Sequence, residues 1–378
     1  MAQSDSAVAR TPMEIWFKIL EHVIDAPEYF DATCQGSFSD FRQKLNNPQP
    51  YFQSMGHLKK IKKVCRSWER FAAEKVHRLV DVRCILCHPH RHVNVKCILW
   101  LPLEVVRRAH AVSIKEHIYD ALECSTLWRK VTISIETIDQ ATALKHLAKN
   151  SSRYPYLRRI YITYQLQDTS YLTYLRYLDN ITLLSLSLPT APFPHLHDQV
   201  TLDRVEILIW EASEVDLGPC KFFHLPSLRH LAITGPFGDP LPLTVALKNT
   251  LVSLHVNGPP TGEFQVSDLF TFPKLEEFAT NMRIDATDFP PCRTLPSLAR
   301  MYLDAYLVGN IGGIKTMIAS GLRGPFTLRA GFRWGTVDPT PLSGDGAAQR
   351  DMDEIMECCK KQGINFVDSA GNTCPYTS

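Results

Sequence analysis

The amino-acid sequence predicts an α/β solenoid, a stack of parallel strands with helices and loops on its outer side, preceded by a small helical module. Two observations predict the solenoid: apolar residues recur in the template apolar-x-x-apolar-x-apolar, and the template repeats every 23 or 24 residues between Leu157 and Leu303. An amphipathic helical pattern near the N-terminus predicts the separate module. A fixed period of this length leaves few other architectures open.

The template gives seven apolar ladders that begin at positions 157, 181, 205, 228, 251, 275 and 298, so the steps are 24, 24, 23, 23, 24 and 23 residues. A unit this small cannot bury its own apolar face, so we expect neighbouring units to stack, share a core and pair their strands in parallel. The ladder residues are Leu157, Ile160, Ile162; Ile181, Leu184, Leu186; Val205, Leu208, Trp210; Leu228, Leu231, Ile233; Leu251, Leu254, Val256; Leu275, Phe278; and Leu298, Met301, Leu303.

This template and period resemble those of the leucine-rich repeat family, in which a short strand is followed by a helical or irregular return. The resemblance implies a concave face formed by the strands. The family often has Asn or Cys eight residues after the first apolar position, where this chain has Gln165, Pro189, Ser213, Pro236, Pro259, Arg283 and Tyr306. We therefore expect an irregular array with proline-stiffened turns. The alternative is a set of unrelated strands in another kind of parallel sheet.

Segments on either side of the ladders extend the array. Trp128, Val131 and Ile133 fit the template 29 residues before Leu157, so the array should begin there. Segment 103–123 fits no template, and we interpret it as helical. Further patterns predict outer helices at 141–148, 169–178, 244–248 and 311–318, a strand at 326–328, a closing helix at 351–360 and a last strand at 364–367.

Composition excludes several classes of protein. The chain has 378 residues, 45% of them hydrophobic, and a net charge of +2, which argues against nucleic acid as the main partner. Residues 1–10 lack the apolar core of a secretory signal, and the longest apolar run, 97–106, is far shorter than the roughly 20 residues that span a bilayer. We expect an intracellular protein, cytoplasmic or nuclear, without a membrane partner, whose eleven cysteines are free thiols.

Two helical patterns form the N-terminal module. Thr11 and Pro12 are typical of a helix start, and Ile15, Ile19, Leu20, Val23 and Ile24 then form one apolar stripe that ends at residues 25–27. A second pattern runs from about His57 to Leu79 and should break near Cys65. Its apolar residues are more than short helices can cover by themselves, so the module should need a partner.

The two ends of this module, Pro12-x-Glu14-Ile15 with Ile19-Leu20 and then Val64-Cys65-x-x-Trp68, resemble an F-box. The resemblance implies a three-helix module that docks on the Skp adaptor of a cullin-based ubiquitin ligase. It also implies which residues form or support the contact: Pro12, Ile15, Ile19, Leu20, Val64, Cys65 and Trp68. Alternatively, the module is a helical cap that seals the first repeat.

The expected domain plan has five parts. Segment 25–56 is an insertion within the F-box-like domain, and its aromatic residues predict a packed insert, similar to the longer F-box-like domains of fungal proteins. The five parts are a disordered tail at 1–10, the F-box-like helical domain at 11–80, a connecting region at 81–126, the leucine-rich repeat domain at 127–345, and a C-terminal cap and tail at 346–378.

A cluster of cysteines and histidines lies in the connecting region. Cys84, Cys87, His88 and Cys97 are residue types that can hold zinc, but the usual zinc modules separate their ligand pairs by about a dozen residues. The other interpretation is a strand, 79–86, whose cysteines are small buried apolar groups. The crowded spacing favours the strand, and we expect no metal and no cofactor.

Side chains between the ladder positions should point onto the concave face, because successive residues of a strand face opposite sides. Mixed charged and aromatic residues there suit protein recognition. The candidate target-binding residues are Arg159, Tyr161, His230, His255, Glu277, Arg300, Tyr302 and Asp304. Leu183, Ile207 and Ile209 in the same rows are apolar, which indicates a covered or adhesive patch.

These features predict a substrate-recognition subunit of a Skp-cullin-F-box ubiquitin ligase, in which the first module binds the adaptor and the repeats bind a target protein. The alternative is a leucine-rich repeat scaffold without a ligase role, and a third hypothesis is a metal-dependent protein built on segment 84–97. The sequence has no Gly-x-x-x-x-Gly-Lys, no Gly-x-Ser-x-Gly and no His-Glu-x-x-His motif. We therefore expect no enzymatic activity and no catalytic residue in this chain.

Overall fold

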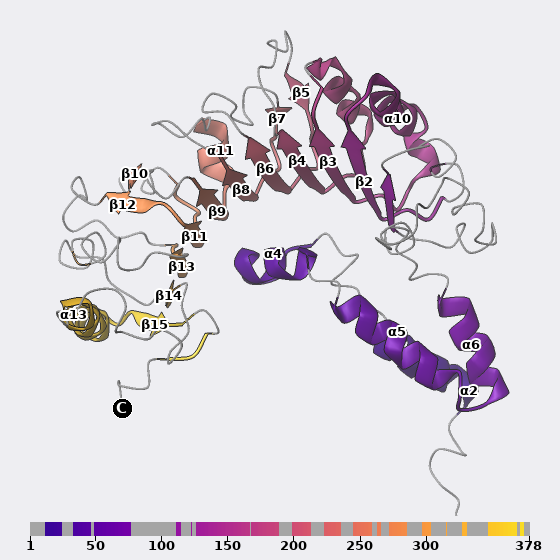
Figure 1. Cartoon of the computed structure of the whole chain (residues 1–378), viewed down its shortest axis with the longest axis horizontal. Coiled ribbons are helices and arrows are strands. Elements are labelled where there is room, and N and C mark those ends of the chain that lie inside the picture. Colours follow the sequence, from indigo (N-terminus) through magenta and orange to yellow (C-terminus); the bar gives the residue numbers. More distant parts are fainter. Residues whose placement is uncertain are drawn as a thin grey trace, which may run out of the picture. The chain divides into compact units, whose positions relative to one another are not determined.

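The computed structural model describes residues 12–24, 33–46, 49–76, 111–114, 122, 126–166, 168–188, 199–212, 223–235, 245–258, 263–265, 272–285, 297–303, 315, 327–330, 347–368 and 371–373 (Figure 1). The chain divides into two compact units. The first comprises residues 1–134 and 139–161, and the second comprises residues 135–138 and 162–378. Each unit is considered by itself below.

Helices dominate the N-terminal part of the first unit. The described helices there are α2 (Met13–Ile24), α4 (Phe38–Asn46), α5 (Gln49–Ile61) and α6 (Arg66–Val76). The carbonyl of Pro12 accepts hydrogen bonds from the amides of Ile15 and Trp16, and α2 ends at Ile24, as predicted. The predicted break in the second pattern is confirmed, because α5 and α6 are separated by residues 62–65.

The predicted packed insert is confirmed in its described part. The amide of Asp40 bonds to Oγ of Ser37, which caps α4, and the rings of Phe38 and Phe41 on the helix are buried. One expectation was wrong in extent: α5 begins at Gln49, eight residues before the predicted start at His57. The end of the insertion therefore belongs to a helix of the module.

Three neighbouring strands of the first unit are β1 (Ala111–Ile114), β2 (Lys130–Ile135) and β3 (Arg159–Tyr164), with α10 (Ile138–Lys149) and a short 3-10 turn (Ser151–Arg153) between β2 and β3. Strand β1 pairs in parallel with β2. The helical interpretation of segment 103–123 is therefore wrong at Ala111–Ile114. This segment is short, and pairing with β2 decides its conformation.

The second unit is built on a parallel sheet whose strands follow the order of the chain. Neighbouring strands keep one register throughout: Leu183 pairs with Ile207, Ile207 with His230 and His230 with Ser253. The strands in spatial order are β4 (Leu183–Leu188), β6 (Ile207–Ala212), β8 (His230–Thr234), β9 (Ser253–Asn257), β11 (Glu277–Thr280), β13 (Arg300–Leu303), β14 (Thr327–Ala330) and β15 (Asn365–Val367). This arrangement is a parallel-strand solenoid, as predicted.

The returns between these strands are irregular. Predicted outer helices appear as the 3-10 helix η4 (Thr169–Tyr177) and the short α11 (Val245–Thr250). The sequence did not predict two small parallel pairs, one of β5 (Val200–Thr201) with β7 (Phe223–His224) and one of β10 (Glu263–Gln265) with β12 (Arg283–Asp285). In Figure 1, α11 and the β5–β7 pair lie on the same side of strands β6 to β9. The helix expected at 311–318 lies outside the described residues except for Lys315.

The C-terminal elements are confirmed. Helix α13 (Ala347–Gln362) covers the predicted closing helix, and β14 and β15 lie at the two predicted late strands. Gly363 ends the helix with φ +69°. The amide of Ile364 then bonds to the carbonyl of Cys359, and the amide of Gly363 bonds to that of Lys360. These two bonds form a Schellman motif, which satisfies the last carbonyls of the helix.

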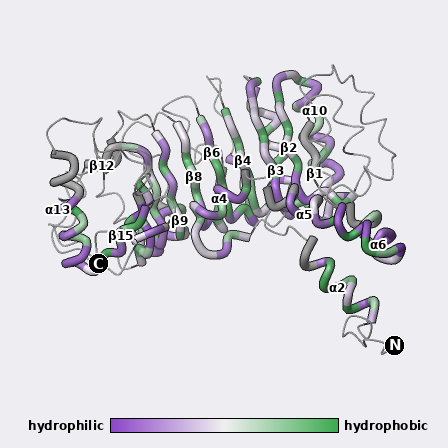
Figure 2. Tube along the Cα trace, turned by 60° about the horizontal axis from the view of Figure 1, so that its bottom comes forward, coloured by the Kyte–Doolittle hydropathy of each residue, from purple (hydrophilic) through white to green (hydrophobic). Residues whose placement is uncertain are grey.

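The core is formed by the ladders. Every ladder residue from Leu157 to Leu303 is buried, and none exposes more than 6% of its surface. Trp128, Val131 and Ile133, the predicted first rung, are completely buried. Figure 2 shows hydrophobic positions recurring along strands β4, β6 and β8. Burial of one face of each strand explains why the register is so regular, since a slip of one residue would turn the ladder away from the core.

Candidate interaction surfaces

Helix α2 uses one face to hold the helical module together. The ring centroids of Trp16 and Trp68 are 5.7 Å apart, and those of Phe17 and Phe71 are stacked at 4.8 Å with 6° between the rings. These two pairs join α2 to the first and second turns of α6. Leu20, one turn after Phe17, is also buried, at 6% exposure. Aromatic pairs of this kind add to the stability that burial alone provides.

The opposite face of α2 leaves large apolar side chains in contact with solvent. Met13, Ile15 and Ile19 are 40%, 48% and 44% exposed, and Val64, in the turn before α6, is 59% exposed. We call these four residues the apolar patch. Helical spacing places Ile15 and Ile19 on one stripe, because they are four residues apart. The contact of Trp16 with Trp68 brings the start of α2 close to the turn that carries Val64.

The residues predicted to contact or support the adaptor fall into two groups. Five of them lie at the surface: Pro12, Ile15, Ile19, Val64 and Cys65 are exposed. The other two pack inside the module, since Leu20 is buried and Trp68 is half-buried against Trp16. This division suits a docking module, in which exposed side chains meet a partner and buried ones hold the helices in position.

A second candidate surface lies on the strands, on the face opposite the ladders, which we call the polar face. Its most organised part crosses β9, β11 and β13. The carboxylate of Glu277 accepts a hydrogen bond from Arg300 Nε at Oε2 and lies 2.9 Å from His255 Nε2 at Oε1, with the Arg300 distance also 2.9 Å. Glu277 has no exposed side-chain surface, His255 has 3% and Arg300 has 29%. The buried carboxylate is therefore paired on both oxygens.

A neighbouring pair continues this row across β8 and β9. Nδ1 of His230 lies 3.1 Å from Oγ of Ser253, and both residues are buried. Burial, followed by the positive charge of Arg229, lowers the pKa of His230 to about 4, although the charge of Glu277 opposes this change. Near neutral pH the imidazole is thus uncharged, which suits its place beside the ion pair.

The eight predicted target-binding residues differ in accessibility. Arg159, His230, His255 and Glu277 are buried, whereas Tyr161, Arg300 and Tyr302 are partly exposed. Asp304 lies outside the described residues. The structure brings His255, Glu277 and Arg300 together in one chain of contacts. The accessible surface at this end of the polar face is formed instead by Arg300, Tyr302 and a residue that was not predicted, Arg329.

Sequence reasoning missed three residues of the polar face, although a signal for them existed. Arg329 lies over the ring of Tyr302 at 5.4 Å, Lys130 lies over Tyr161 at 4.6 Å, and Ser253 is the partner of His230. Residues on neighbouring rungs are about one period apart, so adding 23 to a position finds its neighbour. His230 and Ser253 obey this rule, as do Glu277 and Arg300.

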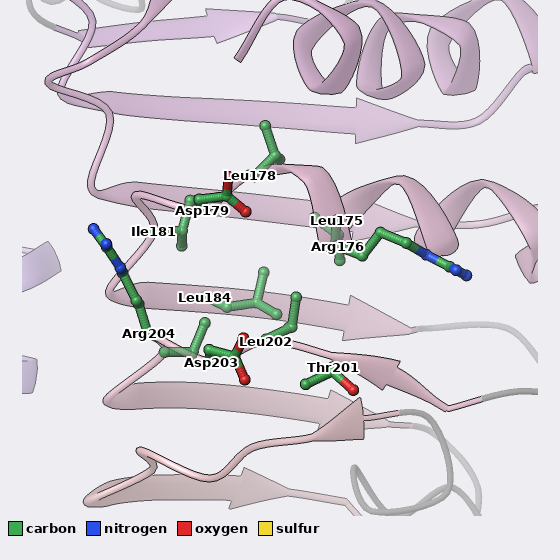
Figure 3. Close-up of a pocket in the computed structure, with 11 residues that line it drawn as sticks. Leu175, Arg176, Leu178, Asp179, Ile181, Leu184, Thr201, Leu202, Asp203 and Arg204 are labelled. Atoms are coloured by element: carbon green, nitrogen blue, oxygen red, sulfur yellow. The ribbon is translucent and has the colours of Figure 1, made fainter. Parts of the chain in front are cut away.

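A small pocket lies beside η4 and β5 in the second unit. Its volume is about 250 Å³, with Leu178, Leu184 and Leu202 among the apolar lining residues and Asp179 and Asp203 at its polar side. Figure 3 shows the two arginines of its lining, Arg176 and Arg204, extending away from it in opposite directions. Small-molecule sites are usually about 300–1,000 Å³ and deeply enclosed. We therefore do not assign a ligand to this pocket.

The described residues contain no group of three or more His, Cys, Asp or Glu side chains arranged to hold a metal ion. Cys84, Cys87, His88 and Cys97, the residues considered for zinc, lie outside the described part of the chain. Within the described part, no helix is both long and apolar enough to cross a membrane.

Comparison with known proteins adds no family to this picture. No protein-family model matches the sequence, and the search of curated proteins gives no match. The assignment of a function therefore depends on the two surfaces described above.

Proposed function

We propose that this chain is the substrate-recognition subunit of a Skp-cullin-F-box type ubiquitin ligase, with an F-box-like module that binds the Skp adaptor and a leucine-rich repeat array that binds a target protein. The ligase chemistry belongs to other subunits in this proposal. This chain contributes proximity, because holding a target next to the transfer machinery makes the transfer effectively intramolecular.

One observation carries the proposal. Ile15, Ile19 and Val64, chosen from the sequence as adaptor contacts, are among the most exposed large apolar side chains of the described residues. Isolated exposed apolar residues are common on protein surfaces, but a group on one small module is typical of an interaction site. The packing of Trp16 on Trp68 and of Phe17 on Phe71 keeps the helices that carry this group in fixed positions.

The repeat array supports the second half of the proposal. Its polar face combines Arg300, Tyr302 and Arg329, and Tyr and Arg are the residue types that most often anchor protein interfaces. The buried pairing of Glu277 with His255 and Arg300 fixes the position of one of these anchors. A preorganised side chain loses less entropy when a partner binds.

Co-purification of the purified Skp adaptor with the full chain tests the proposal. The wild-type chain should retain the adaptor, and a variant with Ile15→Glu and Ile19→Glu should not, because each change places a charge in the apolar patch. Ile138→Glu is the matched control, since Ile138 is 64% exposed on a different helix, α10. Failure of the wild-type chain to retain the adaptor would refute the ligase role and favour the alternative, a repeat scaffold that binds proteins through its polar face.

A further inference from the structure

Helix α4 of the insertion contacts the polar face of the first unit. The guanidinium of Arg159 on β3 lies 5.8 Å from the ring centroid of Phe41 on α4. Arg159 is on the polar face because Ile160 and Ile162, the ladder residues of the same strand, face the core and successive strand residues alternate. Figure 1 shows α10 on one side of β2 and β3 and α4 on the other.

Burial on this face agrees with a covering helix. Arg159 is fully buried and Lys130, on the same face of β2, is 3% exposed. Long cationic side chains are almost never buried at a surface that is open to solvent. The helix buries a matching stripe: Phe38, Phe41 and Leu45, at spacings of three and four residues, expose 0%, 9% and 2%.

Helix α4 is also short enough to depend on this contact. It has nine residues, and isolated helices below about 12–15 residues are only marginally stable in water. Its helical conformation therefore requires packing against the strands. If α4 leaves the polar face, it should lose most of its helical structure and expose Arg159, Tyr161 and Lys130.

We propose that α4 is a resident occupant of the target site: it covers the polar face of β2 and β3, and a target binds there by displacing it with an amphipathic helix of its own. This inference rests on the proposed function in that the repeats bind a target. The stripe on α4 defines the partner, which carries two aromatic residues three positions apart and a leucine four positions later. Binding of such a helix in a groove uses anchors at these spacings.

A peptide of residues 33–46, labelled with a fluorophore at Cys34, is the probe. The chain presents its own α4 at an effective concentration on the order of millimolar, so the peptide should bind the wild-type chain at least about tenfold more weakly than a chain with Phe41→Asp. In that variant, the added charge removes α4 from Arg159 and leaves the site open. Gln43→Asp is the control, because Gln43 is exposed on the same helix and gains the same charge. A peptide that carries Phe41→Asp should not bind.

Acetylation of lysines, followed by mass spectrometry, gives an independent measurement. In the wild-type chain, Lys130 should react much more slowly than Lys149, which is exposed on α10. Phe41→Asp should accelerate the reaction of Lys130 and leave that of Lys149 unchanged. If Phe41→Asp does not fold, Phe41→Ala, which removes the ring without adding a charge, replaces it in both measurements.

Equal reactivity of Lys130 and Lys149 in the wild-type chain would overturn the inference, and so would equal binding of the peptide to the wild-type and opened chains. Neither measurement includes the Skp adaptor. Loss of the ligase proposal in the co-purification experiment therefore leaves these results interpretable, and a negative result here leaves adaptor binding intact.

Discussion

Arg300 donates a hydrogen bond from Nε to Oε2 of Glu277 at 2.9 Å, across one period of the repeat, and the carboxylate it binds has no exposed surface. The two residues are paired in register on β11 and β13. Their accessibilities differ, because Arg300 retains 29% exposure. Loss of either partner should therefore have unequal consequences.

Arg300→Ala should destabilise the protein by about 3–5 kcal/mol, because it leaves a buried carboxylate without its cation. Glu277→Gln should cost less, about 1–3 kcal/mol, since the amide oxygen still accepts a hydrogen bond and Arg300 can reach water. Urea denaturation of each variant measures these changes. Glu276→Gln is the control at an exposed neighbouring carboxylate, and a larger loss from Glu277→Gln than from Arg300→Ala would contradict this ordering.

Acidification should destabilise the fold through His230. Its folded pKa, about 4, is below its ordinary value of 6.5, so between these pH values the unfolded chain holds a proton that the folded chain lacks. Stability should consequently fall as the pH decreases from 6.5 to 4 and change no further through this residue below that range. The full effect is on the order of 3 kcal/mol.

His230→Gln tests this dependence, because glutamine can still bond to Ser253 but does not titrate. Arg229, Glu277 and His255 face the same site, so some pH dependence should remain. Unfolding free energies measured between pH 4 and pH 7 should vary less steeply in the variant. An unchanged slope would show that His230 does not take up the proton.

Two glycines should respond to alanine with opposite signs. Gly363 has φ +69° at the end of α13, so Gly363→Ala should lower stability by about 1 kcal/mol. Gly56 lies inside α5, where an added Cβ meets nothing within 4 Å, so Gly56→Ala should raise stability by about 0.5–1 kcal/mol. Thermal unfolding measures both, and a gain of stability at Gly363 would contradict the assigned helix end.

Two cysteines should differ in reactivity. Burial, followed by the nearby Cys358, raises the pKa of Cys359 to about 12, whereas Cys65 is exposed in the turn before α6. Because the thiolate is the nucleophile, iodoacetamide at pH 8 should label Cys65 more than about tenfold faster than Cys359. Peptide mapping by mass spectrometry measures both rates. Binding of the Skp adaptor should protect Cys65, and undiminished labelling in a stable complex would place the docking surface elsewhere.

The sequence predicted the solenoid because its core is periodic. Each rung repeats the same apolar spacing, so even the weak late strands at β14 and β15 could be found from the template. Strand β1 could not, since a segment of four residues has no period of its own and its pairing with β2 determines it. The small pairs β5–β7 and β10–β12 were missed for the same reason.

Burial on the polar face was harder to predict. Alternation indicates which side of a strand a residue faces, but it does not indicate whether another segment covers that side. Arg159 and His230 look like solvated positions in the sequence and are buried in the structure. The exposed residues of α2 were easier, because an apolar stripe wider than a short helix can bury suggests a partner.

The affinity of the full chain for the purified Skp adaptor tests the central claim most directly. Calorimetry should show binding by the wild-type chain and the Ile138→Glu control. If Ile15 and Ile19 are anchors worth about 2 kcal/mol each, the variant with both changed to Glu should bind at least about a hundredfold more weakly. Equal affinity of the wild-type and doubly substituted chains, or no binding by the wild-type chain, would contradict the account.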